Sequence, residues 1–206
     1  NQVLQIWASK PPYNIQGQFW NISTERTYIP ETGMGTVPLP LQRPHPPIVV
    51  TAVAPYSQGV AEAAARGWDP ISANFLLPQW VKTHWLKYVE GCERVGRQPR
   101  ATDWRVAKTI CVAEDDATAK AYAMGTDGPY YYYYRSLFSK LKRRGALGVF
   151  KTDPKQPDDQ VTLEGVMAQL IIHGSPARVA DQLAALREQT GDFGTLLYAG
   201  MDWQDR

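Results

Sequence analysis

Residues 48–72, IVVTAVAPYSQGVAEAAARGWDPIS, place the strongest constraint on the fold of this chain. A β-branched apolar run is followed by a short turn, an alanine-rich segment and a second apolar run. Apolar runs without polar alternation are typical of parallel strands, whose two faces are both covered by other elements. Because parallel neighbours need a crossover connection, this order predicts a strand, a helix and a second, parallel strand.

The same alternation continues along the chain, and a segment over 125–160 interrupts it. We expect strands over 48–54, 69–75 and 104–112, and helices over 58–66, 79–96 and 115–124. The resumed part has Ser175 as the cap and Pro176 at the first position of a helix. Val179, Leu183 and Leu186 lie on one face of that helix, and the apolar run GTLLYAG follows it.

Strands that alternate with helices predict an α/β fold, either a doubly wound sheet or a (β/α) barrel. About four repeats are visible, whereas a closed barrel needs eight. We therefore expect one domain over 1–206 that holds roughly the C-terminal half of a barrel. Residues 1–7 have a helical pattern without a capping start, which agrees with a helix that continues from upstream. The proline-rich stretch 29–47 is expected to be a long loop.

Composition narrows the class of partner. The apolar runs are far shorter than the roughly 20 residues of a membrane-spanning helix, and the formal charge is +2, so neither a membrane nor a nucleic acid is indicated. Cys92 and Cys111 have no metal-ligand spacing, so we expect two buried thiols and no metal site. A small-molecule partner and a cytoplasmic location follow as the expectation.

The turn before the alanine-rich segment is a candidate anion site. After Pro55 and Tyr56, Ser57 stands directly before the expected helix. The first amides of a helix have no partner within it and carry partial positive charge, so they and the Ser57 hydroxyl could bind a phosphate. The alternative is ordinary, since serine is also a common helix cap.

Two further side chains are candidates for a pocket. Asn74 stands at the C-terminal end of an expected barrel strand, where sites form, although asparagine is also common in turns. His84, between Trp80 and Trp85, could line a pocket, but a lone histidine on an apolar helix is more often packed or exposed. His45 and His173 have structural positions by the same reasoning.

Residues 130–134 are five consecutive tyrosines, followed by a basic stripe. If helical, they face nearly all round the helix, so some must contact protein or ligand. The basic stripe has five members: Arg135, Lys140, Lys142, Arg143 and Arg144. A lid over an active site, ordinary packing with a solvated basic face, and nucleic-acid stacking are the alternatives, of which the last needs an open face.

Three longer stretches carry a resemblance to a known family. Residues 44–76, 96–123 and 173–203 resemble, in order and spacing, the C-terminal half of the bacterial-luciferase-like flavin-dependent monooxygenases. Within that family the stretches Pro11–Trp20 and Phe193–Trp203 are similar to those of the limonene 1,2-monooxygenase-like group.

The resemblance implies a (β/α)8 TIM barrel with FMN at the C-terminal mouth of its strands. It places Pro55, Tyr56 and Ser57 at the cofactor phosphate. It also implies a monooxygenase that uses reduced FMN and O2 on a small apolar, terpene-like substrate, a separate flavin reductase, and a homo-oligomer. The family's catalytic histidine comes from earlier strands, so the catalytic residues are not identified here beyond the pocket candidates Asn74 and His84.

Two other functions fit the same resemblance. One is a deazaflavin-dependent oxidoreductase that transfers hydride, and the other is a non-catalytic, flavin-binding barrel protein. The sequence contains no G-x-G-x-x-G fingerprint for a nicotinamide dinucleotide, which agrees with reducing power supplied by another protein.

Overall fold

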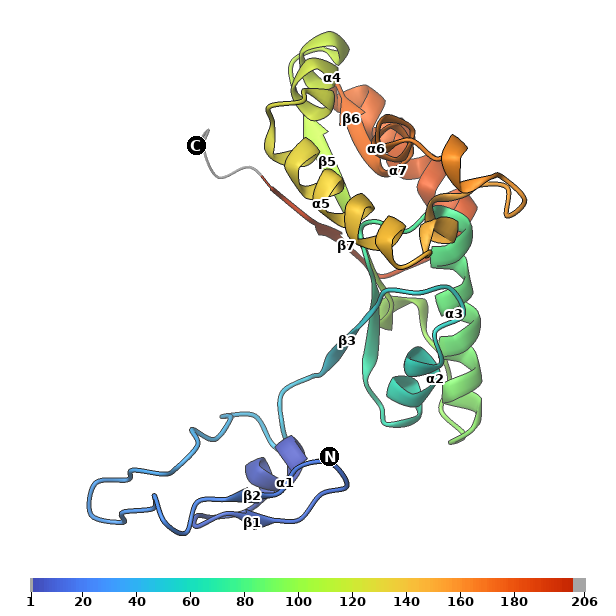
Figure 1. Cartoon of the computed structure of the whole chain (residues 1–206). Coiled ribbons are helices and arrows are strands. Elements are labelled where there is room, and N and C mark those ends of the chain that lie inside the picture. The colour runs from blue at the N-terminus through green and yellow to red at the C-terminus, as the bar shows by residue number, and fades with distance from the viewer. Residues whose placement is uncertain (1, 202–206) are drawn as a thin grey trace. The chain divides into compact units, whose positions relative to one another are not determined.

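A computed structural model describes residues 2–201, and residues 1 and 202–206 lie outside the description. The last two residues of the family-like stretch 193–203 are among the latter. The chain forms two compact units, Asn1–Ile48 and Val49–Arg206 (Figure 1). The single domain expected over 1–206 stays a prediction.

The first unit is small and consists largely of loop. It contains helix α1 (Gln2–Ala8) and a two-stranded antiparallel ribbon of β1 (Asn14–Ile15) and β2 (Ile22–Ser23). Tyr13 is buried beside this ribbon, where its amide donates to Thr24 Oγ1 at 2.8 Å. Residues 29–47 have no helix or strand beyond an isolated bridge, which confirms the expected long loop.

The second unit contains a five-stranded sheet and the helices that pack against it (Figure 1). The strands are β3 (Val49–Ala52), β4 (Asp69–Ser72), β5 (Arg105–Val112), β6 (Ile171–Gly174) and β7 (Thr195–Tyr198). The helices are α2 (Gln58–Ala65), α3 (Pro78–Glu93), α4 (Asp116–Met124), α5 (Pro129–Arg143), α6 (Leu163–Leu170) and α7 (Pro176–Thr190). Three short 3-10 turns complete the unit, at Ala101–Asp103, Leu147–Phe150 and Asp158–Gln160. Every helix and strand expected from the sequence is present, with ends that differ by a few residues.

All strand pairs in this sheet are parallel, as the sequence predicts. Strands β3, β4, β5 and β6 follow in order, and β7 also pairs with β5. Both β4 and β7 pair with Arg105 and Val106, so they lie on opposite edges of β5. Strand β6 pairs with the later half of β5, from Thr109 to Val112. Strand β5 is therefore the centre of the sheet.

Side chains of β5 alternate between two buried layers. Val106 and Ile110 pack with Val81 of α3 and Leu186 of α7. Cys111 packs with Tyr130 and Tyr134 of α5 in a separate cluster. Because helices cover both faces of this strand, its sequence has no polar alternation.

The outer strands differ from the expectation that both faces are covered. Val49 of β3 is 40% exposed and Leu197 of β7 is 46% exposed. The expectation was wrong for these two strands, since within residues 49–201 no other element covers one face of each. The apolar run in each strand predicts its parallel pairing but does not predict that one face of the strand is exposed.

Local signals fix several helix ends. Ser175 and Pro176 occupy the cap and first position of α7, and Val179 and Leu186 are buried beneath it, as expected. Asp115 caps α4 by accepting the Thr118 amide at 2.8 Å. Both cysteines are buried thiols, as expected. In residues 2–201 no helix has the length and apolarity needed to cross a membrane.

Helices α2 and α3 pack in direct contact at Gly91. A Cβ built at Gly91 would lie 2.2 Å from the Ala61 carbonyl oxygen and 2.7 Å from the Ala64 Cβ. The small side chains of α2 thus allow close approach only while position 91 has none.

We expect Gly91→Ala to destabilise the second unit by about 1–3 kcal/mol, because the added methyl group must push α2 away from α3. Gly148→Ala is the control, since a Cβ there meets no atom within 4 Å. Urea unfolding followed by circular dichroism measures both. Equal stability of the two variants would contradict the close packing of α2 on α3.

Candidate functional site

The turn between β3 and α2 leaves hydrogen-bond donors free at a helix start. Ser57 is the cap residue of α2, yet its hydroxyl makes no capping bond. The amide of Val60 donates to the Ser57 carbonyl at 3.0 Å, whereas the amides of Gln58 and Gly59 have no acceptor within residues 2–201. Ser57 therefore occupies the cap position of α2 without a capping hydrogen bond from its hydroxyl.

Two adjacent residues of α3 hold this turn in place. The Tyr56 amide donates to Thr83 Oγ1 at 2.9 Å, and that hydroxyl donates to the Trp80 carbonyl at 2.6 Å. The His84 Nε2 atom lies 2.8 Å from the Ala54 carbonyl oxygen. Tyr56 has a φ of 51°, in the left-handed region that costs energy for a residue with a Cβ. The bonds from α3 stabilise this conformation.

His84 belongs to a buried hydrogen-bond chain with one possible direction. Trp104 Nε1 can only donate, and it lies 3.0 Å from Ser72 Oγ. The Ala54 carbonyl can only accept, so His84 carries its proton on Nε2. Its Nδ1 atom then accepts from Ser72 Oγ at 2.8 Å. The neutral ring thus connects the centre of the sheet to the turn before α2.

His84 is a buried residue and does not line a pocket, contrary to its candidacy from the sequence. Its side chain is 0% exposed, and both ring nitrogens have protein partners. Burial lowers the pKa of the ring below its usual range, which keeps it neutral. In this geometry His84 positions the turn and does not touch a ligand.

The charges nearest to the start of α2 are paired. The Gln58 carboxamide accepts from Lys87 Nζ at 3.2 Å and donates to Glu90 Oε1 at 3.3 Å. Lys87 and Glu90 themselves form an ion pair at 2.7 Å. The attraction for an anion at this turn therefore comes from backbone amides, the helix dipole and the Ser57 hydroxyl, a donor set that suits a phosphate group.

Asn74 follows β4 and connects the sheet to α5. Its Nδ2 donates to Thr109 Oγ1 at 2.9 Å, and its Oδ1 accepts from the Tyr133 hydroxyl at 3.2 Å. The Tyr134 hydroxyl donates to the same Thr109 oxygen at 3.0 Å. Burial raises the pKa of Tyr133, so its hydroxyl keeps the proton it donates. The structure therefore brings Asn74 together with the tyrosine run, which sequence reasoning had treated separately.

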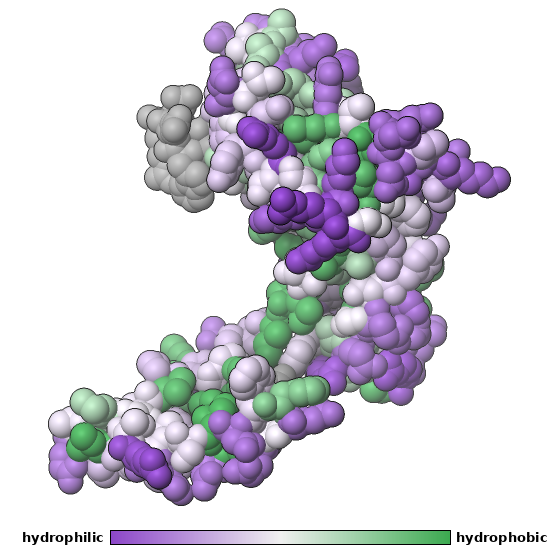
Figure 2. All heavy atoms as spheres, viewed as in Figure 1, coloured by the Kyte–Doolittle hydropathy of each residue, from purple (hydrophilic) through white to green (hydrophobic). Residues whose placement is uncertain are grey.

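The tyrosine run is helical and divides between core and surface. Tyr130 and Tyr134 are buried, while Tyr132 is 78% exposed. This confirms the expectation that some of the five contact protein. Lys140, Lys142 and Arg143 occupy the last turn of α5, and Figure 2 shows hydrophilic side chains over this part of the helix. The partial negative charge at the C-terminal end of the α5 dipole stabilises these basic side chains.

An open pocket of about 390 Å³ adjoins the turn. Pro55 and Trp80 line one part of it. The rest is lined by six residues of the segment that interrupts the strand and helix alternation: Gly145, Ala146, Gly148, Val149, Lys151 and Pro154. The turn after β3 and the segment 125–160 therefore border one hollow.

Three residues of this region carried no signal that sequence reasoning could use. Thr83, Ser72 and Trp104 are buried, and their hydrogen bonds support the turn. Their role depends on which strands and helices become neighbours.

The remaining histidines lie outside this site. The His45 ring lies 6.3 Å from the Trp7 ring in the first unit. His173 belongs to β6, and its carbonyl accepts from Gln182 Nε2 at 2.8 Å.

Comparison with known proteins places this geometry in context. The family described as luciferase-like monooxygenase matches residues 1–192. The chain is 28% identical to the 3,6-diketocamphane 1,6-monooxygenase of Pseudomonas putida, over 98% of this chain and 53% of that protein. It is 24% identical to the 2,5-diketocamphane 1,2-monooxygenase 1 of the same species, over 75% of this chain and 43% of that protein. The chain thus spans about half the length of these curated relatives.

Solved structures agree on the fold. The oxygenating constituent of the Pseudomonas putida 3,6-diketocamphane monooxygenase, a type II Baeyer–Villiger monooxygenase in complex with FMN, superposes with a TM-score of 0.74. It is 26% identical, and the match covers 97% of this chain and 54% of that one. The coenzyme F420-dependent tetrahydromethanopterin reductase of Methanopyrus kandleri has a TM-score of 0.56 at 15% identity, over 95% of this chain and 54% of that one, which shows a shared fold alone.

These matches and the parallel sheet confirm the expected α/β fold, as a part of a luciferase-like barrel. Within residues 2–201 the sheet is open and forms no closed barrel.

The buried His84 ring predicts a pH dependence of stability. Its pKa in the folded protein is lowered from the usual 6.5, so the unfolded chain takes up the proton more readily. The stability contributed by the neutral ring is therefore present above about pH 6.5 and is lost as the pH falls below it. Urea unfolding between pH 7.5 and 5 should show a smaller slope of unfolding free energy with pH for His84→Gln than for the wild type.

Gly148→Ala, which changes no titratable group and whose Cβ meets no atom within 4 Å, is the control and should keep the wild-type slope. An unchanged slope for His84→Gln would show that His84 does not hold the turn as a neutral ring.

Proposed function

Because this chain belongs to the luciferase-like monooxygenase family, we propose that it forms part of an enzyme that uses reduced FMN and O2 to oxygenate a small apolar, terpene-like compound. Two relatives that act as named diketocamphane monooxygenases, one of them solved with FMN, support this proposal. The donors at the start of α2 are the observation in this chain that carries it.

The flavin phosphate is assigned to the turn Pro55–Tyr56–Ser57. The Ser57 hydroxyl and the amides of Gln58 and Gly59 are the donors in residues 2–201 that this turn offers without a protein acceptor. An anion bound there gains from charge-assisted hydrogen bonds and from the dipole of α2. Thr83 and His84 act through the backbone, because they fix the turn that carries these donors.

Bound reduced FMN would supply the electrons and the centre at which O2 is activated. The residues of this chain would bind the flavin, orient the substrate and exclude water. Asn74 lies two residues past the C-terminal end of β4, where TIM-barrel sites form, and it bonds to Thr109 in β5. The packed aromatic residues Phe75, Trp80 and Tyr133 give this region an apolar character, which suits exclusion of water.

We also propose that the segment 125–160 covers this mouth as a lid. The Tyr133 hydroxyl bonds to Asn74, and the part around Gly145 and Gly148 shares a pocket with Pro55. The second of these contacts borders the proposed cofactor turn. A separate flavin reductase, a homo-oligomeric assembly and a cytoplasmic location complete the proposal.

Flavin titration of the full-length protein tests the phosphate assignment. Ser57→Ala should weaken FMN binding about tenfold or more, because a hydrogen bond to a charged group contributes about 1.5–3 kcal/mol. Binding of riboflavin, which lacks the phosphate, should be unchanged. Ser175→Ala is the matched control, because Ser175 is also a cap residue whose hydroxyl makes no capping bond and is followed by a helix of the same unit.

Three outcomes would contradict parts of this proposal. Equal FMN affinity of Ser57→Ala and the wild type, or an equal loss for riboflavin, would remove the phosphate from this turn. Tighter binding of a deazaflavin coenzyme than of FMN would support the hydride-transferring alternative. Failure to incorporate ¹⁸O from ¹⁸O2 into any terpene-like product would contradict the monooxygenase while leaving the binding result intact.

A further inference from the structure

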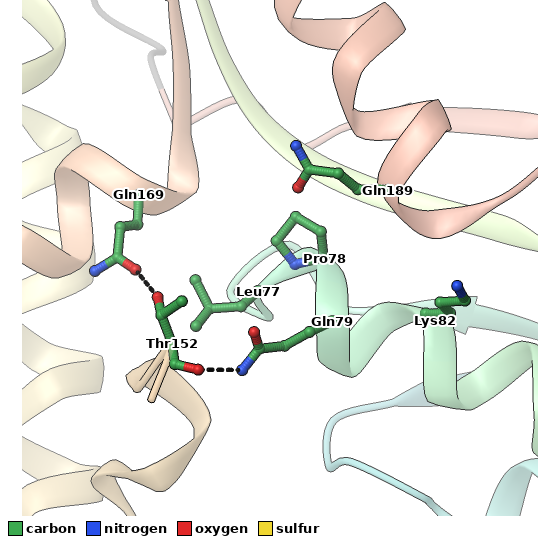
Figure 3. A pocket seen from close by; sticks show the side chains of 7 residues that line it. All are labelled: Leu77, Pro78, Gln79, Lys82, Thr152, Gln169 and Gln189. Carbon is green, nitrogen blue, oxygen red and sulfur yellow. Dashed lines mark hydrogen bonds between the residues drawn. The ribbon is translucent and has the colours of Figure 1, made fainter. Parts of the chain in front are cut away.

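A polar hollow lies between the helices that pack on β5, and its walls contain none of the residues of the turn before α2. It has two adjoining parts, of about 520 Å³ and about 190 Å³. Both are lined by Pro78 at the start of α3, Gln169 on α6 and Gln189 on α7 (Figure 3). We refer to the two parts together as the glutamine cavity.

Lys108 of β5 lines the smaller part and is an unusual residue for its place. It is 2% exposed, and its ammonium donates to the Leu76 carbonyl at 2.8 Å. An ammonium has three donors, and within residues 2–201 Lys108 has neither a second acceptor nor a carboxylate partner. A buried charge without a counter-ion is costly, so a bound anion would stabilise it.

The protonation state of Lys108 is consistent with binding of an anion. Burial lowers its pKa to about 8. The side chain is therefore mostly charged at pH 7 and loses the charge as the pH rises above 8.

The walls of the glutamine cavity favour an anion and contain no acidic residue. On one side Gln79 Nε2 donates to the Lys151 carbonyl at 3.0 Å, and Thr152 Oγ1 donates to Gln169 Oε1 at 2.8 Å. Gln189 lies on the opposite side (Figure 3) and makes no hydrogen bond within residues 2–201. Lys82, which is exposed, lines the larger part.

The smaller part also has an apolar wall, formed by Leu170, Ile172, Ala185 and Leu186. This wall could receive a short hydrocarbon body beside the charged group. One buried positive charge matches one negative charge, because a dianion would leave a second charge uncompensated in the interior.

We propose that the glutamine cavity binds a small organic monocarboxylate, with its carboxylate on Lys108 and the Gln189 amide and its hydrocarbon part on the wall of Leu170, Ile172 and Leu186. The site is distinct from the proposed flavin turn, so its ligand would be a second small molecule of the protein. It does not rest on the flavin assignment.

Isothermal titration of the full-length protein with sodium isobutyrate tests this site, and neutral isobutyramide has nearly the same shape. Isobutyrate should bind saturably at pH 7, and isobutyramide should not. Lys108→Met should weaken isobutyrate binding about tenfold or more, because it removes a charged hydrogen bond. Lys82→Met is the matched control, since it removes the exposed lysine of the same cavity, and should change binding less than twofold.

Two further measurements guard against a variant that misfolds. Ala185→Leu narrows the cavity but keeps Lys108, and it should also weaken binding, while circular dichroism reports whether each variant keeps the wild-type fold. Wild-type affinity should fall about tenfold or more between pH 7 and pH 9.5, as Lys108 loses its charge. Binding of isobutyramide as tight as isobutyrate, unchanged binding by Lys108→Met, or no saturable binding by the wild type would each overturn the proposal.

Discussion

The arrangement of the second unit depends on the buried hydrogen bonds that connect β5, β4 and α3 to the turn after β3. Trp104 precedes β5, Ser72 ends β4, and His84 lies on α3, so one chain of donors joins three elements. Its last bond reaches the Ala54 carbonyl. Buried polar groups that are fully satisfied specify a single arrangement, because any alternative leaves a donor or acceptor without a partner. The turn before α2 is thereby held with its free donors outward, although Tyr56 has a left-handed backbone.

Much of the fold could be predicted from local patterns. The apolar run at 48–54 and the alanines after it indicated a parallel strand and a closely packed helix, and the structure contains both as β3 and α2. Ser175 and Pro176 marked the start of α7 because cap and first-turn preferences act within a few residues. The exposure of Val49 and Leu197 could not be predicted, since it depends on which elements lie beside the strand.

Some features of the candidate site could also be predicted from the sequence, and others could not. Ser57 was found because a helix start and its donors are local features. His84 was identified as a polar residue in an apolar helix, but its role as a buried support could not be predicted, because Ser72 and Ala54 are distant in sequence. The tyrosine run was expected to contact protein, and its partners Asn74 and Thr109 emerged only from the tertiary structure. Lys108 lies within β5, and its lack of a carboxylate partner within residues 2–201 depends on the tertiary structure, so the sequence does not predict it.

We propose that the start of α2 receives the phosphate of FMN. A crystal structure of the full-length protein with FMN tests it most directly. We predict phosphate oxygens about 2.7–3.2 Å from Ser57 Oγ and from the Gln58 or Gly59 amide nitrogen. FMN bound with its phosphate elsewhere, and these three donors still without a ligand acceptor, would contradict the claim.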